Sequence, residues 1–314
     1  MKNHLTKWLS GVTVALLLTT FFACNKTGLN GGQPGPNQNR VSIYLTDGPG
    51  YFDKVFVNIQ SIAVKIDTAQ HWWGDNDNGP DNQGEDDQGN DDHDGQGHHH
   101  DWWNNWGNHD QDDQSAIWDT LKITPGIYNL LNFANGADTL LTSSNIPKGR
   151  IIAFKITLAD NGNSLVKDSV SYPLHLLSGW NTVYVRVFGN NFQSVSSNHY
   201  KIWIDFDAGR SVIKVFNGMF YLRPVLRAFA VSNTGSVVGN VQPSDAYPVI
   251  SVFNSSDTLY AIPGRGGMFM VRGLPAGTYN VFINTSNGYQ DTTINNVTVS
   301  AGQTANLGSI TLHK

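Results

Sequence analysis

The stretch RVSIYLTDGP, residues 40–49, alternates apolar and polar side chains almost without a break. Val41, Ile43 and Leu45 fall on one face of an extended chain, and the residues between them fall on the other. Successive side chains of a β-strand point to opposite faces, so this pattern predicts a half-buried strand. The Asp-Gly-Pro-Gly sequence at 47–50 is typical of a turn and ends the strand.

The same alternation recurs along the chain. The next run, KVFVNIQSIAVKID, loses its period of two between Ile59 and Ile62, and a β-bulge near Gln60 and Ser61 would restore it. Further runs of this kind are RIIAFKITL, NTVYVRVF, KIWIDFD, SVIKVF and FYLRPVLRAFAV, with turn sequences between them. Many short strands at this spacing predict an all-β fold of the sandwich type.

The charge of the chain is unevenly distributed. The net charge of the 314 residues is −5, but thirteen of the 25 acidic residues lie between His71 and Asp113, where there is no Lys or Arg. The 20 basic residues are scattered along the predicted strands instead of clustered. We therefore expect no nucleic-acid partner.

The chain begins with MKNHLTKWLSGVTVALLLTTFFACNK, which has the organisation of an export signal. Lys2 and Lys7 precede an apolar run of about fifteen residues, too short to cross a bilayer and suited to a signal peptide. Cys24 closes this run and is the single cysteine, so no disulfide can form within the chain. The Ala23-Cys24 junction resembles the lipobox of bacterial lipoproteins, which implies a cleaved signal peptide at 1–23 and lipidation of Cys24.

This resemblance implies a lipid anchor in the bacterial outer membrane, with the protein facing the periplasm or the cell surface. Residues 24–39 are rich in Gly, Asn and Pro, and they predict a flexible tether between the anchor and the first domain. Phe21 and Phe22 stand where a lipobox usually has Leu and a small residue. An ordinary secretory leader is therefore the alternative.

Several motifs in the first domain occur in the order of a family of bacterial envelope lipoproteins whose hallmark is an LTD-x-P opening. They are VSIYLTDGP, GIYNLLNFANG, IPKGRIIAFKITLADN, YPLHLLSG, IDFDAGRSV and YLRPVLRA. The chain resembles this domain-of-unknown-function family over residues 40–231. The resemblance implies a β-sandwich domain at 40–232 in a cell-envelope setting, and it implies no activity.

Three aspartates, Asp47, Asp205 and Asp207, lie near the ends of predicted strands. Asp205 and Asp207 are two residues apart, so both would project from one face of a strand and could do acid/base work or hold Ca²⁺. A strand-end Asp more often accepts hydrogen bonds from backbone N–H groups of a turn, and we favour that interpretation. No motif for a nucleophile, a catalytic metal or a phosphate loop occurs, so we expect no catalytic residue and no enzyme.

Residues 70–114 have a low-complexity composition, and the elements on either side of them are neighbours in the family that the chain resembles, so the resemblance implies an insert at a hairpin. Gly, Asn, Asp and Gln dominate it, and such a segment buries too little apolar surface to offset its ordering entropy. His and Asp are ligands of Zn²⁺, and carboxylates also bind Ca²⁺. The candidate metal ligands are Asp92, Asp94, His98, His99, His100 and Asp101. We expect weak binding of divalent metal and no required cofactor; a specific calcium loop at 90–101 and a purely solvated loop are the alternatives.

The insert also carries an unusual number of tryptophans. Trp72 and Trp73 open it, and Trp102, Trp103 and Trp106 lie near its end. We favour an arrangement in which the two groups pack across the hairpin. In the alternative, the three later indoles form a stacking surface for sugar rings or for another envelope protein.

The remaining segment, residues 233–314, contains the runs SVVGNV, VISVF, GMFMVRGLPAGTYNVFI and NVTVSAGQTANLGSITL. It resembles the carboxypeptidase regulatory-like, prealbumin-like fold, which implies a second β-sandwich. Gly273 and Gly277 flank a Leu-Pro-Ala sequence, as a tight turn requires. Tyr279 is expected to pack inside the sandwich, and Tyr289 is the nearby candidate for contact with a sugar.

Together these features predict two β-sandwich domains behind a cleaved lipoprotein signal peptide. The expected function is that of a lipid-anchored cell-envelope protein with a non-enzymatic binding or scaffold role, and carbohydrate is the favoured ligand. The alternative is a divalent-metal-binding lipoprotein that uses the His- and Asp-rich insert.

Overall fold

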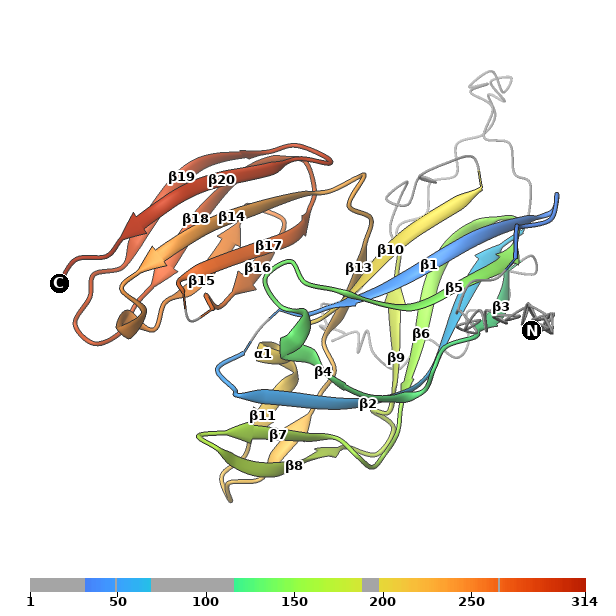
Figure 1. The fold of residues 1–314 in the computed structure, drawn as a ribbon, viewed down its shortest axis with the longest axis horizontal. Coiled ribbons are helices and arrows are strands. Elements are labelled where there is room, and N and C mark those ends of the chain that lie inside the picture. The colour runs from blue at the N-terminus through green and yellow to red at the C-terminus, as the bar shows by residue number, and fades with distance from the viewer. Residues whose placement is uncertain (1–31, 49, 69–115, 188–197, 265) are drawn as a thin grey trace, which may run out of the picture.

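The computed structural model describes residues 32–48, 50–68, 116–187, 198–264 and 266–314. Over these residues the chain forms twenty β-strands, one short helix, α1 (Ala208–Ser211), and two 3-10 turns, η1 (Leu130–Phe133) and η2 (Ser244–Ala246). The strands form four sheets, two in each of two units with separate hydrophobic cores (Figure 1). The predicted all-β sandwich fold is confirmed, whereas the predicted signal peptide lies outside the described residues.

The N-terminal unit contains a four-stranded sheet. Its order is β13 (Leu226–Phe229), β10 (His199–Phe206), β1 (Gln38–Thr46) and β5 (Thr139–Pro147). β1 lies inside this sheet, parallel to β10 and antiparallel to β5. Val41, Ile43 and Leu45 of β1 are all buried, as their spacing predicts.

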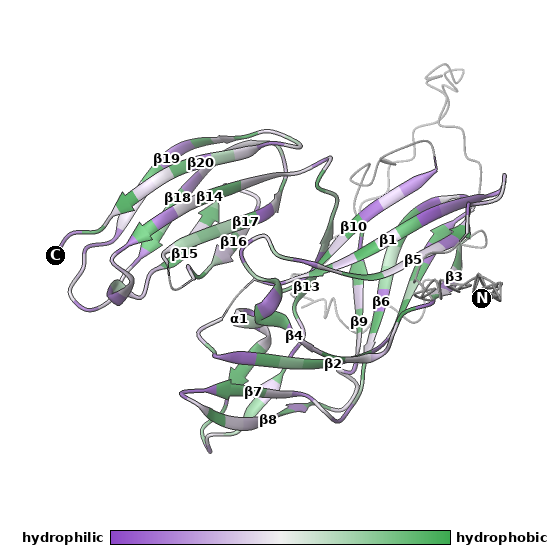
Figure 2. Cartoon of the chain, in the orientation of Figure 1, coloured by the Kyte–Doolittle hydropathy of each residue, from purple (hydrophilic) through white to green (hydrophobic). Residues whose placement is uncertain are grey.

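A larger sheet of nine strands packs against the first. Its order is β11 (Val212–Lys214), β12 (Phe220–Leu222), β8 (Val170–Leu176), β7 (Ser164–Lys167), β2 (Lys54–Asp67), β6 (Arg150–Leu158) and β9 (Thr182–Arg186), and both β3 (Ala116–Leu121) and β4 (Gly126–Asn129) also pair with β2. The core between the sheets draws its side chains from both of them. Hydrophobic and hydrophilic residues alternate along the strands, as Figure 2 shows, so each sheet turns one apolar face toward the core. Phe154 and Phe206 are fully buried, and each such side chain contributes about 1.5–3 kcal/mol by leaving water.

The predicted bulge in β2 is present. Ile59 pairs with Leu158 of β6, whereas Ser61 pairs with Thr157, so β2 has one residue more than its partner between these pairs. The extra residue shifts the alternation by one position. Ile62 is therefore buried in the core together with Ile59.

The run FYLRPVLRAFAV, expected as one strand, is divided in the structure. Its first part forms β12 in the nine-stranded sheet, and its second part forms β13 in the four-stranded sheet. The division falls at Arg223 and Pro224. Proline has no N–H to donate to a sheet, so the chain leaves one sheet here and enters the other.

The C-terminal unit is a second, smaller sandwich (orange to red in Figure 1). One sheet has the order β17 (Met268–Leu274), β14 (Gly235–Gln242) and β20 (Thr304–Thr311), and the other has the order β16 (Thr258–Ala261), β15 (Val249–Phe253), β18 (Gly277–Asn284) and β19 (Thr292–Val299). The predicted tight turn joins β17 to β18. Gly273 has a φ of +74°, a conformation that glycine adopts without strain. Tyr279 is buried in the core, as expected.

Candidate functional site

The lipidation site, the candidate metal ligands and the candidate stacking residues of the insert lie outside the described residues. This holds for the lipidation site Cys24, for the candidate metal ligands Asp92, Asp94, His98, His99, His100 and Asp101, and for Trp102, Trp103 and Trp106. β2 and β3 pair as a hairpin up to Asp67 and Ala116, so the insert connects two neighbouring strands, as predicted. Among the described residues, no group of three or more His, Cys, Asp or Glu could hold a metal, and none of the helices could span a membrane.

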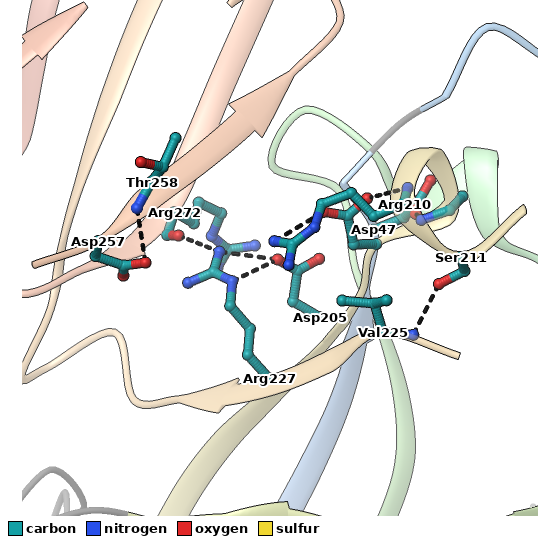
Figure 3. Close-up of polar contacts among 11 residues, drawn as sticks. Asp47, Asp205, Arg210, Ser211, Val225, Arg227, Asp257, Thr258 and Arg272 are labelled. Atoms are coloured by element: carbon teal, nitrogen blue, oxygen red, sulfur yellow. Dashed lines mark hydrogen bonds and ion pairs between the residues drawn. The ribbon is translucent and has the colours of Figure 1, made fainter. Parts of the chain in front are cut away.

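The three strand-end aspartates lie close enough for their charges to interact, and each has a separate structural partner; Figure 3 shows Asp47 and Asp205. Asp47 follows β1 and accepts a hydrogen bond from the N–H of Ala208 at 3.0 Å. Asp207 caps α1 by accepting from the N–H of Arg210 at 2.8 Å. Asp205, inside β10, accepts from Nε of Arg227 at 2.8 Å. The interpretation of Asp47 and Asp207 as caps is therefore correct, and Asp205 instead forms an ion pair.

Burial raises the pKa of two of these carboxyls. It holds the pKa of Asp47 well above the ordinary value, and the negative charges of Asp205 and Asp207 add to this effect. Burial likewise raises the pKa of Asp207 to about 6, although the Arg210 N–H acts in the opposite direction. Oδ2 of Asp47 and Oδ1 of Asp205 are shielded from solvent and have no hydrogen-bond partner. A substrate cannot reach these two oxygens, so the cluster is suited to structure instead of acid/base work.

Two arginines join the units in a reciprocal arrangement that we call the arginine clamp. Arg227, from the N-terminal unit, donates from Nη1 to the carbonyl oxygen of Gly273 at 3.1 Å and from Nη2 to that of Arg272 at 2.5 Å. Arg272, from the C-terminal unit, pairs with Asp138 at 3.1 Å. Its guanidinium also lies over the ring of Trp203, 5.4 Å from the centroid. Figure 3 shows Arg227 between the Asp205 carboxylate and the backbone of β17.

Aromatic side chains gather on the outward face of the nine-stranded sheet. Trp118 of β3 and Tyr184 of β9 form an edge-to-face pair with ring centroids 6.0 Å apart, although two strands, β2 and β6, lie between theirs. The rings are 39% and 48% exposed. Nζ of Lys155 lies 5.2 Å from the centroid of the Trp118 ring. We call these three side chains the aromatic face.

The register explains how the two rings meet. Trp118 pairs with Lys65, which pairs with Ala153, and Tyr184 pairs with Lys155, which pairs with Ala63. Paired residues share a face of the sheet, so all these side chains point outward. Each of the two rows therefore has one alanine and one lysine on the central strands. Ala63 and Ala153 leave room above β2 and β6, beside the two lysines, for the large rings to lean inward.

The aromatic face was not among the residues predicted from the sequence. The signal was present, because Trp118 and Tyr184 occupy outward positions of alternating runs, where a polar residue is expected. In the C-terminal unit, the ring of Tyr289 is less available for contact with a sugar than the sequence predicted. Its hydroxyl donates to Asp245 at 3.2 Å, and Nζ of Lys314 lies over its ring at 4.8 Å. One face of that ring is therefore covered.

The fold and these sites can now be compared with known proteins. Residues 38–224, more than half of the chain, match the family described as a domain of unknown function, DUF4382. The chain belongs to this family. The DUF4382 match covers nearly the same residues as the predicted resemblance to an uncharacterised domain family. It ends before β13, so the carboxypeptidase regulatory-like resemblance of the C-terminal segment stays a prediction.

A search of the curated proteins found no match. Among solved structures, a type II cohesin–X-dockerin complex from Acetivibrio cellulolyticus is 26% identical over 25% of this chain and 56% of that chain, less than two thirds of its length, with a TM-score of 0.21. The minor pilin GBS52 of Streptococcus agalactiae is 10% identical over 87% of this chain and 95% of that chain, with a TM-score of 0.20. The shaft pilin SpaA of Lactobacillus rhamnosus GG is 9% identical over 88% and 97%, with a TM-score of 0.20. Because these TM-scores are low, we draw no conclusion from the three likenesses.

Proposed function

We propose that the protein is a lipid-anchored scaffold of the cell envelope that binds carbohydrate through the aromatic face and has no catalytic role. The observation that carries this proposal is the exposed Trp118–Tyr184 pair with Lys155 beside it. Large aromatic side chains are usually buried in a soluble domain, and a group of them on the surface marks a binding site more often than a single one does.

The chemistry of the aromatic face suits a sugar. Lys155 lies over the Trp118 ring as Lys314 lies over Tyr289, so the part of Trp118 that stays exposed, 39%, is what offers an apolar surface to the C–H groups of a pyranose. The ammonium group of Lys155 can donate to ring oxygens and hydroxyls beside it. Both side chains come from strands of a large sheet and not from a loop, so little order is lost on binding. Because the rings lie on the outside of a sheet, they are accessible to an extended polymer.

The test is retention on insoluble polysaccharides, measured as a dissociation constant from depletion assays with the chain from Asn25 to Lys314. We expect Trp118→Ala and Tyr184→Ala each to weaken binding about tenfold, which corresponds to about 1.4 kcal/mol of stacking energy. Phe216→Ala is the matched control, because Phe216 is also an exposed aromatic residue but lies elsewhere. Equal losses in all three variants, or no loss in any, would contradict the proposal.

The same assay separates the alternative function, metal binding by the insert. Six of the ten histidines lie between His71 and His109, which favours this alternative. A variant lacking residues 74–109 is expected to keep its affinity for polysaccharide. Metal binding is measured separately, by titration calorimetry of the full chain and of this variant with Zn²⁺ and Ca²⁺. A stoichiometric metal site that is present in the full chain and absent from the variant would support the metal-binding function.

The lipid anchor is the second part of the proposal. It rests on the apolar run that ends at Ala23 and Cys24. Acyl chains hold a protein to a membrane because each buried CH₂ group contributes about 0.8 kcal/mol. We expect Cys24→Ser to move the protein from the outer-membrane fraction to the soluble fraction of fractionated cells, and an unchanged distribution would contradict the anchor.

A further inference from the structure

Asp47 has no cation partner in the part of the chain that the structure describes. Three other aspartates near the junction of the two units each pair with an arginine, namely Asp205 with Arg227, Asp207 with Arg210 and Asp138 with Arg272. Only 5% of Asp47 is exposed to solvent. Burial of an ionised carboxylate without a counter-ion is costly, whereas the neutral acid avoids most of that cost. The surroundings therefore favour the protonated form of Asp47.

A protonated Asp47 has a hydrogen-bond donor, and a matching acceptor lies nearby. Oδ1 of Asp47 accepts from the N–H of Ala208, and Oδ2 has no partner among the described residues. Asp205 is 7% exposed, and its Oδ2 accepts from Arg227 while its Oδ1 also has no partner there. Asp47 directly follows Thr46, which pairs with Asp205 across β1 and β10, and both aspartates line the same small cavity. A carboxylic acid donates and a carboxylate accepts, so one hydrogen bond would satisfy both oxygens.

We propose that Asp47 keeps its proton in the folded protein and donates a hydrogen bond from Oδ2 to Oδ1 of Asp205, which makes the junction of the two units sensitive to pH. One proton then serves two carboxyls. Burial raises the pKa of Asp47, as the location of the proton on this residue requires. Polysaccharide binding at the aromatic face plays no part in this arrangement.

The groups around the pair oppose a second negative charge there. The charges of Asp205 and Asp207 both act against ionisation of Asp47, and the N–H of Ala208, which acts in the opposite direction, faces Oδ1 and not Oδ2. The charged or titratable side chains near the pair are Asp207 and Arg210 at α1, Arg227 from β13, Arg272 from β17 with its partner Asp138, and Tyr260 from β16. Each of these arginines is held by its own carboxylate, so a second charge on the pair would have no counter-ion of its own.

The proton links pH to the arginine clamp. Asp205 holds Arg227, whose guanidinium donates to the backbone of β17 in the C-terminal unit. When Asp47 ionises, its charge repels the Asp205 carboxylate that positions this guanidinium. The folded state binds the Asp47 proton more tightly than the unfolded state, so the stabilisation is fully present below pH 3.8 and is lost as the pH rises through the raised pKa. The attachment of the two units should therefore weaken as the pH rises.

The first measurement is the ¹³C chemical shift of the Asp47 carboxyl carbon, followed by NMR as the pH is varied in the chain from Asn25 to Lys314. The signal that disappears in Asp47→Asn identifies this carbon. We expect the shift of a protonated acid at neutral pH, where an ordinary aspartate is ionised, and a titration midpoint well above 3.8. The shift of a carboxylate at neutral pH would overturn the location of the proton, and this result needs only the wild-type protein.

Differential scanning calorimetry tests the consequence for the two units. The wild type should show one transition below the pH at which Asp47 titrates and two transitions above it. Asp47→Asn keeps an oxygen for the N–H of Ala208 and places an amide N–H beside Oδ1 of Asp205, so it should show one transition at both pH values. Asp207→Asn is the matched control, because it removes a neighbouring carboxyl outside the pair, and its units should separate as those of the wild type do. If the wild type keeps one transition throughout, or if Asp47→Asn separates at the same pH, the shared proton does not govern the junction and the inference is overturned.

Discussion

Asp207 titrates in a range that an ordinary aspartate does not reach. Its pKa in the folded protein is about 6, because the side chain is largely buried beside Asp205. The folded state therefore binds the Asp207 proton more tightly than the unfolded state does. The resulting stabilisation is fully present below pH 3.8 and is lost as the pH rises through about 6. The pKa of Asp47 is raised as well, so its contribution has the same sign.

We predict that Asp207→Asn makes the free energy of unfolding less dependent on pH between pH 4 and 7. Asparagine keeps the oxygen that caps α1, so the loss of the titrating group is the main change. The difference in stability between variant and wild type should shift in favour of the variant by up to about 3 kcal/mol over this range. Urea unfolding at several pH values measures it. Asp168→Asn, at an exposed aspartate, should follow the wild-type profile, and identical profiles for both variants would contradict the prediction.

At the scale of elements, local sequence patterns predicted the features of a strand that depend on residues close together in the sequence. The alternation in β1 and the bulge after Ile59 follow from the spacing of apolar residues, whereas the hairpin of β2 and β3 was expected from the resemblance to the family. The division of β12 from β13 was missed because apolar periodicity continues across Pro224. That proline has no N–H to donate to a neighbouring strand, and this argues against one continuous strand even where the apolar period continues.

Strand order was beyond the reach of those patterns. Trp118 and Tyr184 meet across β2 and β6, where Ala63 and Ala153 leave room beside two lysines, and this arrangement depends on pairing between distant segments. The aspartate cluster was predicted as a set of caps, but the partner of Asp205 comes from β13 and could not be read from its own strand. The sequence therefore indicated candidate residues, but only the pairing of distant strands determines which of them are in contact.

At the scale of the whole molecule, the arginine clamp couples two separate cores. Arg227 and Arg272 each reach across to the other unit, and the Asp205 and Asp138 carboxylates hold them in place. Tyr51 adds a hydrogen bond from its hydroxyl to the carbonyl oxygen of Tyr247 at 2.6 Å. Planar guanidinium groups make several such bonds at once, which lysine cannot reproduce. The two units should therefore unfold together.

We predict that the double variant Arg227→Lys and Arg272→Lys separates the thermal unfolding of the two units. Lysine retains the positive charge, so the buried Asp205 keeps a counter-ion, but the bonds to the opposite backbone are lost. Differential scanning calorimetry should show one transition for the wild type and two for the variant. Arg223→Lys, at an exposed arginine, is the control and should keep one transition. A single, unbroadened transition in the double variant would show that the clamp does not couple the units.

The central claim is that polysaccharide binds at Trp118. The most direct measurement is the indole N–H region of the NMR spectrum during titration of the chain from Asn25 to Lys314 with polygalacturonate. The signal that disappears in Trp118→Phe identifies this residue, and we predict that it shifts first and furthest. If the Trp118 signal stays in place while the signals of Trp102, Trp103 and Trp106 move, the insert is the binding surface and the assignment to the aromatic face is wrong.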